Sequence, residues 1–185
     1  MAKNEIVYPI SSPEVKQLPL LISKSVFTLK ECRQIIEMGI PQLEPKRPLR
    51  FGKKKVEGAI VLPSDIDWLY ARLAGLFATN NCWGFHLSGM QPMNILRYRP
   101  GCFTRMHVDY KPHFANFAKI TAIVQLVDPD SYVGGLLHVT EEGDPVRLEC
   151  GDCVVFPSVV MHGVSRVDKG ARIVLAAWAA GPQLR

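Results

Sequence analysis

The chain has 185 residues and a mass of 20.7 kDa, and 48% of its residues are hydrophobic, enough for one domain to bury a full core without disulfide bonds. Its formal net charge is +5, and no apolar stretch approaches the length of a membrane span, which excludes an integral membrane protein and predicts a soluble one. The five scattered cysteines and the absence of a secretory leader exclude a disulfide framework and predict reduced thiols in the cytoplasm.

The first predicted element is a helix that starts near Thr28 and runs to about Met38. Thr28 can cap the helix, and Glu31 follows three residues later, the spacing of a capping box. We expect Gly39 to end it.

A basic segment follows, made up of Lys46, Arg47, Arg50, Lys53, Lys54 and Lys55. We expect a solvated loop over most of it, with a short strand within 52–62. Contact with an acidic or phosphorylated substrate is the alternative, and nucleic-acid binding is a minor one.

A second helix is predicted from the cap signal Ser64-Asp65 to about Ala78. Its apolar stripe consists of Ile66, Leu69, Leu73, Leu76 and Phe77. Both helices are expected to pack on the core.

From Trp83 onward, short β-rich runs alternate with glycine and proline turns. We predict strands at 84–88, 93–99, 104–108, 120–126, 136–140, 146–148, 153–157, 162–164 and 172–179. Helices first and strands afterwards predict an α+β fold with a β-barrel-like core. We expect a single domain, 1–185, in which 1–82 supply supporting helices and loops and 83–180 the core.

Cys150 and Cys153 form a C-x-x-C motif, a pattern that occurs in zinc sites and in redox-active proteins. No second pair lies at a suitable spacing, and an apolar run follows, so two structural thiols are the preferred interpretation.

The central motif is His107-Val108-Asp109. On an extended chain, residues i and i+2 project to the same face, so His107 and Asp109 can converge on one point. Two histidines and one carboxylate form the facial triad that leaves open positions on iron(II). Candidates for the second histidine are His86, His113, His138 and His162. His162 is preferred, because it follows a buried-looking run and precedes Gly163, which suits a strand that returns beside the first.

Arg172 opens the apolar run 173–178. A guanidinium at the mouth of an apolar strand needs an anion, and its planar fork matches a carboxylate. A dicarboxylate cosubstrate would supply that anion; an ion pair with a nearby acidic residue is the alternative.

These motifs occur in one order along the chain: 94–101 (Asn-Ile-Leu-Arg-Tyr-Arg-Pro-Gly), 107–110, 128–135 (Asp-Pro-Asp-Ser-Tyr-Val-Gly-Gly), 151–152, 162–164 and Arg172. In this order, from Met93 to Trp178, the chain resembles the prolyl-4-hydroxylase-type iron(II)/2-oxoglutarate dioxygenases.

The resemblance implies a double-stranded β-helix, or jelly roll, with iron(II) bound by His107, Asp109 and His162. It also implies that 2-oxoglutarate chelates the metal and that its far carboxylate meets Arg172 and the Tyr98 hydroxyl. Gln125 occupies a position where related enzymes often place a tyrosine that contacts the cosubstrate. Ascorbate is a candidate additional cofactor.

The implied activity is hydroxylation of an unactivated C–H bond with dioxygen, yielding succinate and CO2. An amino acid, a peptide with a prolyl residue and a small metabolite all remain open as substrate. Candidate substrate contacts are Arg105, Tyr110, His113, His138 and Trp178. The alternatives are a non-catalytic, cupin-like metal-binding jelly roll and an interaction module.

Overall fold

The computed structural model describes residues 20–43, 49–51, 54–110, 117–140 and 143–182. Two helices occur in these residues, α1 (Leu29–Leu43) and α2 (Asp67–Thr79), with a short 3-10 turn at Pro129–Ser131. The described strands are β1 (Leu21–Ser23), β2 (Leu49–Phe51), β3 (Lys54–Val61), β4 (Gly89–Met90), β5 (Met93–Tyr98), β6 (Phe103–His107), β7 (Phe117–Gln125), β8 (Val133–Gly134), β9 (Leu137–Val139), β10 (Cys153–Pro157), β11 (His162–Val164), β12 (Val167–Lys169) and β13 (Arg172–Gly181).

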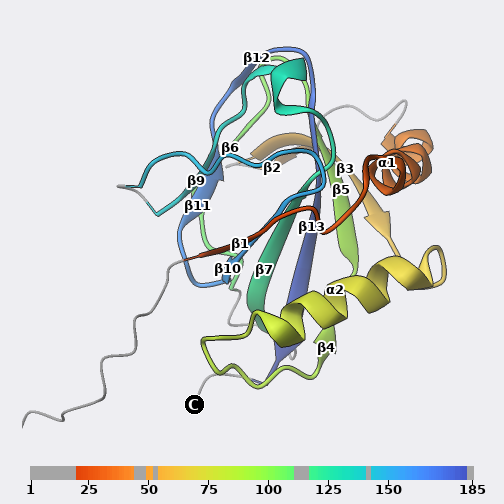
Figure 1. The fold of residues 1–185 in the computed structure, drawn as a ribbon. Helices are drawn as coiled ribbons and strands as arrows, with labels where there is room; N and C mark the ends of the chain where they lie inside the picture. Colours follow the sequence, from red (N-terminus) through yellow and green to blue (C-terminus); the bar gives the residue numbers. More distant parts are fainter. Residues whose placement is uncertain (1–19, 44–48, 52–53, 111–116, 141–142, 183–185) are drawn as a thin grey trace, which may run out of the picture.

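The strands pair antiparallel in the order β1-β10-β7-β13-β5-β3-β6-β11-β9. Strand β3 lets the sheet fold over on itself, because Glu57–Val61 pair with β5 whereas Lys54–Lys55 pair with β6. Strands β1, β10, β7, β13 and β5, with the second half of β3, form the larger layer. This layer faces β6, β11 and β9 across the interior of the roll (Figure 1). This is the predicted jelly-roll core of an α+β fold.

Strand β13 shows how the two faces of the larger layer differ. Ile173, Leu175 and Ala177 point to the helices, whereas Val174 and Ala176 point into the roll, as strand alternation requires. Both α1 and α2 pack on the outer face (Figure 1). Their buried residues belong to one apolar cluster with Ile95 and Ile120. The helices thus stiffen the sheet without entering the interior of the roll.

The predicted capping box opens α1. The Thr28 backbone N–H donates to Glu31 Oε2 at 2.8 Å, and the Glu31 N–H donates to Thr28 Oγ1 at 3.3 Å. The predicted end at Gly39 is wrong, because α1 continues to Leu43 and contains Pro41 in its last turn. A Cβ at position 39 would lie 2.5 Å from Ile95 Cδ1, so this glycine permits close packing of the helix on β5 and does not terminate it.

The apolar stripe of α2 is confirmed, since Leu69, Leu73 and Phe77 are buried. The predicted cap is wrong. Asp65 accepts a hydrogen bond from the Leu62 N–H at 2.8 Å and closes the preceding turn, and Ile66 at the N-cap makes no side-chain cap bond. Neither described helix is long and apolar enough to cross a bilayer.

Most predicted strands are confirmed, and 153–157 and 162–164 match in full. Two are wrong. Residues 84–88 form a loop held by Asn81, whose side chain bonds both the N–H and the carbonyl of Phe85, and 146–148 contribute a single bridge from Val146 to Leu137. The short strand predicted within 52–62 is confirmed as β3, and the structure adds β1, β2, β4, β8 and β12.

All five cysteines lie in the described residues and are free thiols. Burial, with Cys150 nearby, raises the pKa of Cys32 to about 12, and burial also raises the pKa of Cys153. Cys150 donates to the Leu126 carbonyl at 3.2 Å. These contacts agree with packing roles for the C-x-x-C pair.

Asp152 ties β1 to the turn before β10. Its carboxylate accepts from the Ser25 N–H at 2.9 Å, the Glu149 N–H at 3.0 Å and Lys24 Nζ at 2.7 Å. Burial acts to raise the pKa of Asp152, but these donors outweigh it and lower the pKa below its usual value. A carboxyl whose folded-state pKa is depressed stabilises the fold above its unfolded pKa, and this stabilisation is lost as the pH falls through the folded pKa.

We therefore expect Asp152→Asn to lower the free energy of unfolding by about 1–3 kcal/mol at neutral pH, because an amide N–H would face the Glu149 donor. Urea unfolding at neutral and acidic pH measures this. The difference between the two proteins should shrink on acidification, and a difference that grows would contradict the role given to Asp152.

Candidate metal centre

A β-bulge in β6 sets which side chains enter the roll. His162 pairs with His107 and Val164 pairs with Thr104, so three steps along β6 face two steps along β11. Thr104 and His107 consequently both point inward. The extra residue turns Arg105 outward, where its side chain is exposed.

Gly163 lies opposite this bulge, and the bulge requires a glycine there. A Cβ at position 163 would lie 2.9 Å from the Thr104 carbonyl oxygen, 3.0 Å from the Met106 nitrogen and 2.8 Å from Met106 Sδ. Two of these atoms belong to the backbone and cannot move without shifting β6.

The side chains of His107, Asp109 and His162 come together inside the roll, where β6 ends at His107. One potential ligand atom from each lies within 4.8 Å of the others. His107 Nε2 is 3.3 Å from Asp109 Oδ1, and His162 Nε2 is 3.4 Å from Asp109 Oδ2. The Ser158 carbonyl accepts from the Asp109 N–H at 2.9 Å and holds the chain beyond β6 in place.

Both imidazoles turn Nδ1 toward backbone carbonyls. His107 Nδ1 lies 3.0 Å from the carbonyl oxygens of Arg105 and of His162, and His162 Nδ1 lies 3.1 Å from the Val160 carbonyl oxygen. A proton on each Nδ1 satisfies these acceptors and leaves the Nε2 lone pair for a metal. His107 Nε2 is buried without a hydrogen-bond partner, as expected of an atom that serves as a ligand.

The Asp109 carboxylate is oriented by its own donors. Asp109 Oδ2 accepts hydrogen bonds from Trp178 Nε1 at 2.7 Å and from Thr121 Oγ1 at 3.1 Å. The hydroxyls of Thr121 and Ser158 are hydrogen-bonded to each other at 2.9 Å. Burial acts to raise the pKa of Asp109, but the neighbouring imidazoles of His107 and His162 and the Trp178 indole outweigh it and hold the pKa well below its usual range. The group is an anion at neutral pH, the form that binds a metal.

Arg172 lines the same cavity as the three ligand candidates. It lies at the other end, because Arg172 opens β13, whereas Trp178, six residues further along that strand, is the residue that bonds Asp109. Arg172 pairs with Tyr98 in the sheet, and its guanidinium carbon is 5.8 Å from the Tyr98 ring centre. The side chain is only 3% exposed, and Nη1 has no hydrogen-bond partner. A buried guanidinium in this state is costly unless an anion joins it.

The Tyr98 hydroxyl lies 3.1 Å from Thr104 Oγ1, and both residues line the cavity beside Arg172. Burial raises the pKa of Tyr98, so its hydroxyl keeps its proton at neutral pH. Apolar walls complete the cavity, formed by Leu96, Ile123, Leu137, Val164, Val174 and Ala176. The cavity thus has a ligand triad at one end and a cationic, hydroxyl-bearing end at the other.

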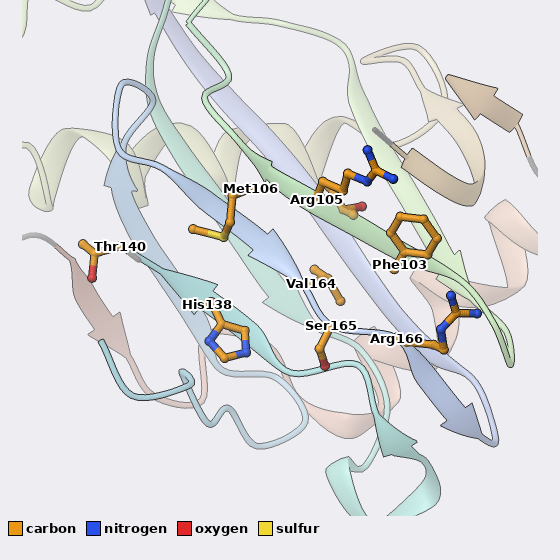
Figure 2. Close-up of a pocket in the computed structure, with 9 residues that line it drawn as sticks. Phe103, Arg105, Met106, His138, Thr140, Val164, Ser165 and Arg166 are labelled. Atoms are coloured by element: carbon orange, nitrogen blue, oxygen red, sulfur yellow. The ribbon is translucent and has the colours of Figure 1, made fainter. Parts of the chain in front are cut away.

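Other predicted site residues lie elsewhere. Gln125 is buried and donates to the Val127 carbonyl at 2.9 Å and to the Tyr132 hydroxyl at 3.2 Å, outside the cavity lining. Arg105 and His138 lie on the outer face of β6 and β9 (Figure 2). His113 is outside the described residues.

Tyr110 and Trp178 both lie close to Asp109. The Tyr110 ring stacks on Phe117 with 5.3 Å between ring centres, and the Trp178 indole bonds the carboxylate itself. Sequence reasoning missed Thr104, Thr121 and Ser158. Thr121 lies two residues from the cavity-lining Ile123 on β7, so strand alternation could have identified it. Thr104 could not be identified in this way, because the bulge lies between it and His107.

The model of the 2OG-Fe(II) oxygenase superfamily matches residues 93–180. A PKHD-type hydroxylase of Prochlorococcus marinus is 32% identical over 75 residues, which are 40% of this chain and 34% of that protein. A PKHD-type hydroxylase of Gluconacetobacter diazotrophicus is 27% identical over 171 residues, 83% of this chain and 74% of that protein. The chain therefore spans about a third of the length of the first relative and about three quarters of the second.

Among solved structures, a Pseudomonas putida prolyl-4-hydroxylase superposes with a TM-score of 0.74 at 20% identity, over 90% of this chain and 95% of that one. At this identity the likeness concerns the fold, which is the jelly roll described above.

Gly163→Ala should displace the bulge and pull His107 away from Asp109 and His162. We expect a loss of about 1–3 kcal/mol in the free energy of unfolding, as for other overpacked sites, together with weaker metal binding in titration calorimetry with Mn2+. Gly75→Ala in α2 is the control, because nothing lies within 4 Å of its Cβ position; helix propensity predicts that it stabilises by about 0.5–1 kcal/mol. Equal metal affinity in Gly163→Ala and the unaltered protein would refute the role given to the bulge.

Trp178→Phe keeps an aromatic ring but removes the donor to Asp109. Because the remaining Thr121 bond leaves Oδ2 freer to turn, we expect the affinity for Mn2+ to fall by about tenfold, in the range reported for losing a hydrogen bond that orients a ligand. Thr121→Val should act in the same direction. Unchanged affinity in both variants would show that these bonds do not position the carboxylate.

Proposed function

We propose that this chain, which belongs to the 2OG-Fe(II) oxygenase superfamily, is an iron(II)- and 2-oxoglutarate-dependent hydroxylase of an unactivated C–H bond. One observation carries the proposal: one cavity holds a His-Asp-His cluster with a partnerless imidazole nitrogen and, at its other end, a buried guanidinium whose Nη1 has no hydrogen-bond partner. A metal satisfies the first and a carboxylate the second.

His107, Asp109 and His162 would hold the iron. Two imidazoles and one carboxylate suit iron(II) and leave positions open for other ligands. Bound there, iron would supply the oxidising chemistry of the reaction, in which 2-oxoglutarate loses CO2, one atom of dioxygen enters the resulting succinate, and the other enters the substrate C–H bond. The backbone carbonyls at Nδ1 and the donors on Asp109 keep the three side chains turned toward one point.

Arg172 would bind the far carboxylate of 2-oxoglutarate, with Tyr98 beside it. Thr104 is an additional contact, since its hydroxyl shares a hydrogen bond with Tyr98 and lines the same cavity. A pair of hydroxyls joined by one bond retains one proton to donate to a carboxylate. The apolar walls around them exclude water and strengthen these charge interactions.

Hydroxylation is the favoured reaction because the relatives in the comparison carry the names PKHD-type hydroxylase and prolyl-4-hydroxylase. An amino acid, a peptide that presents a prolyl residue and a small metabolite are the candidate substrates. Dioxygen is the oxidant, and ascorbate remains a candidate auxiliary reductant.

The direct test incubates the iron(II)-loaded protein with 2-oxoglutarate and peptide or metabolite mixtures, and measures succinate release and a mass gain of one oxygen atom in any component. We expect succinate formation that His107→Ala abolishes. A protein that binds a metal but never consumes 2-oxoglutarate would be the non-catalytic, cupin-like jelly roll.

Arg172→Ala should weaken 2-oxoglutarate binding by about two orders of magnitude, because it removes the only cation at that end of the described cavity. Thr104→Val should weaken it by about tenfold through loss of one hydrogen bond. Calorimetric titration of 2-oxoglutarate into anaerobic, iron-loaded protein measures both, and metal affinity should not change. If Arg172→Ala binds 2-oxoglutarate as the unaltered protein does, the anchor lies elsewhere.

A further inference from the structure

A groove of about 560 Å³ lies on the face of β6, β11 and β9 that points away from the metal centre. Figure 2 shows Phe103, Arg105 and Arg166 at one end of this outer groove and Met106, His138 and Thr140 at the other. The bulge that turns His107 inward also turns Arg105 outward, so both surfaces arise from one feature of β6.

The outer groove is cationic. It has two arginines and a histidine among its described lining residues and no aspartate or glutamate. Arg105 is exposed, and no acidic residue in the described part of the chain pairs with Arg105 or with Arg166. The Arg166 guanidinium rests 5.5 Å from the Phe103 ring centre and 3.5 Å from the Gly101 carbonyl, which positions it without neutralising it.

The outer groove also has apolar surface between the charges. The side chains of Phe103 and Met106 line it, and its lining residues come from β6, β9, β11 and the residues that follow β9 and β11. An extended peptide advances about 3.3 Å per residue and turns alternate side chains to one side. A segment in which acidic residues alternate with apolar ones would therefore meet both the arginines and the apolar surface.

We propose that the outer groove binds an extended, acidic segment of a partner polypeptide. This interaction goes beyond the hydroxylase function and needs neither iron nor 2-oxoglutarate. The occupant would lie along the back of the strand that carries His107, because Phe103, Arg105 and Met106 of that strand line the groove. Polypeptide is favoured over nucleic acid because the described lining offers apolar surface, and its one phenyl ring, Phe103, already pairs with the Arg166 guanidinium and does not serve as a free platform for base stacking.

The test is fluorescence anisotropy with a short fluorescein-labelled peptide in which glutamate alternates with leucine. Its control peptide has glutamine in place of glutamate. We expect saturable binding of the glutamate peptide, weaker binding of the glutamine peptide, and about a tenfold loss of affinity in the double variant Arg105→Glu/Arg166→Glu. Lys30→Glu/Arg33→Glu makes the same change in net charge on exposed positions of α1 and should leave binding unchanged.

Three results would overturn the proposal: no binding of the glutamate peptide, equal loss in both double variants, or tighter binding of a single-stranded oligonucleotide than of the peptide. Iron and 2-oxoglutarate binding by the single variant Arg166→Glu, measured by calorimetry, should match that of the unaltered protein, whereas its affinity for the glutamate peptide should fall. Failure of the groove and failure of the hydroxylase assignment are thus separate outcomes.

Discussion

The three-against-two register between β6 and β11 is the constraint on which the rest of the site depends. Without the extra residue, alternation would place Thr104 and His107 on opposite faces of the strand. The bulge brings both into the roll, so that one strand supplies a metal-ligand candidate and a hydroxyl for the far end of the cavity. Gly163 makes this register possible, because any side chain there would meet the β6 backbone.

Electrostatics then divide the cavity into two ends. At one, Asp109 carries a negative charge that two histidines, an indole and a threonine stabilise. At the other, Arg172 holds a buried positive charge next to two hydroxyls, and no described residue neutralises it. Such an arrangement is expensive for a protein that binds nothing, since each unsatisfied group keeps its desolvation cost. A metal and an anionic cosubstrate remove both costs together.

The residue types that form the site were easier to predict from the sequence than the positions of their side chains in the fold. His107, Asp109, His162 and Arg172 stood out because an imidazole, a carboxylate and a guanidinium beside apolar runs demand partners, and the structure brings all four to one cavity. Their roles as ligands and anchor remain proposals. Thr104 could not be found, because strand alternation alone puts it out of phase with His107.

Predictions of where a residue lies were wrong where tertiary contacts outweighed local sequence patterns. Gly39 reads as a helix end, but the absent side chain serves contact with Ile95. Arg105 and His138 were expected at the site and instead face outward, and Gln125 bonds to Tyr132 away from the cavity lining. Each outcome depends on how neighbouring strands register, which the local sequence does not encode.

The most direct measurement of the two-ended cavity is the dependence of 2-oxoglutarate affinity on the metal. Calorimetric titrations of 2-oxoglutarate would be run on the metal-free protein, on the iron(II)-loaded protein without oxygen, and on His162→Ala under both conditions. We expect one iron per chain and much tighter 2-oxoglutarate binding when iron is present, with this enhancement lost in His162→Ala. Equal affinity with and without iron, or full enhancement in His162→Ala, would contradict a shared cavity in which metal and cosubstrate meet.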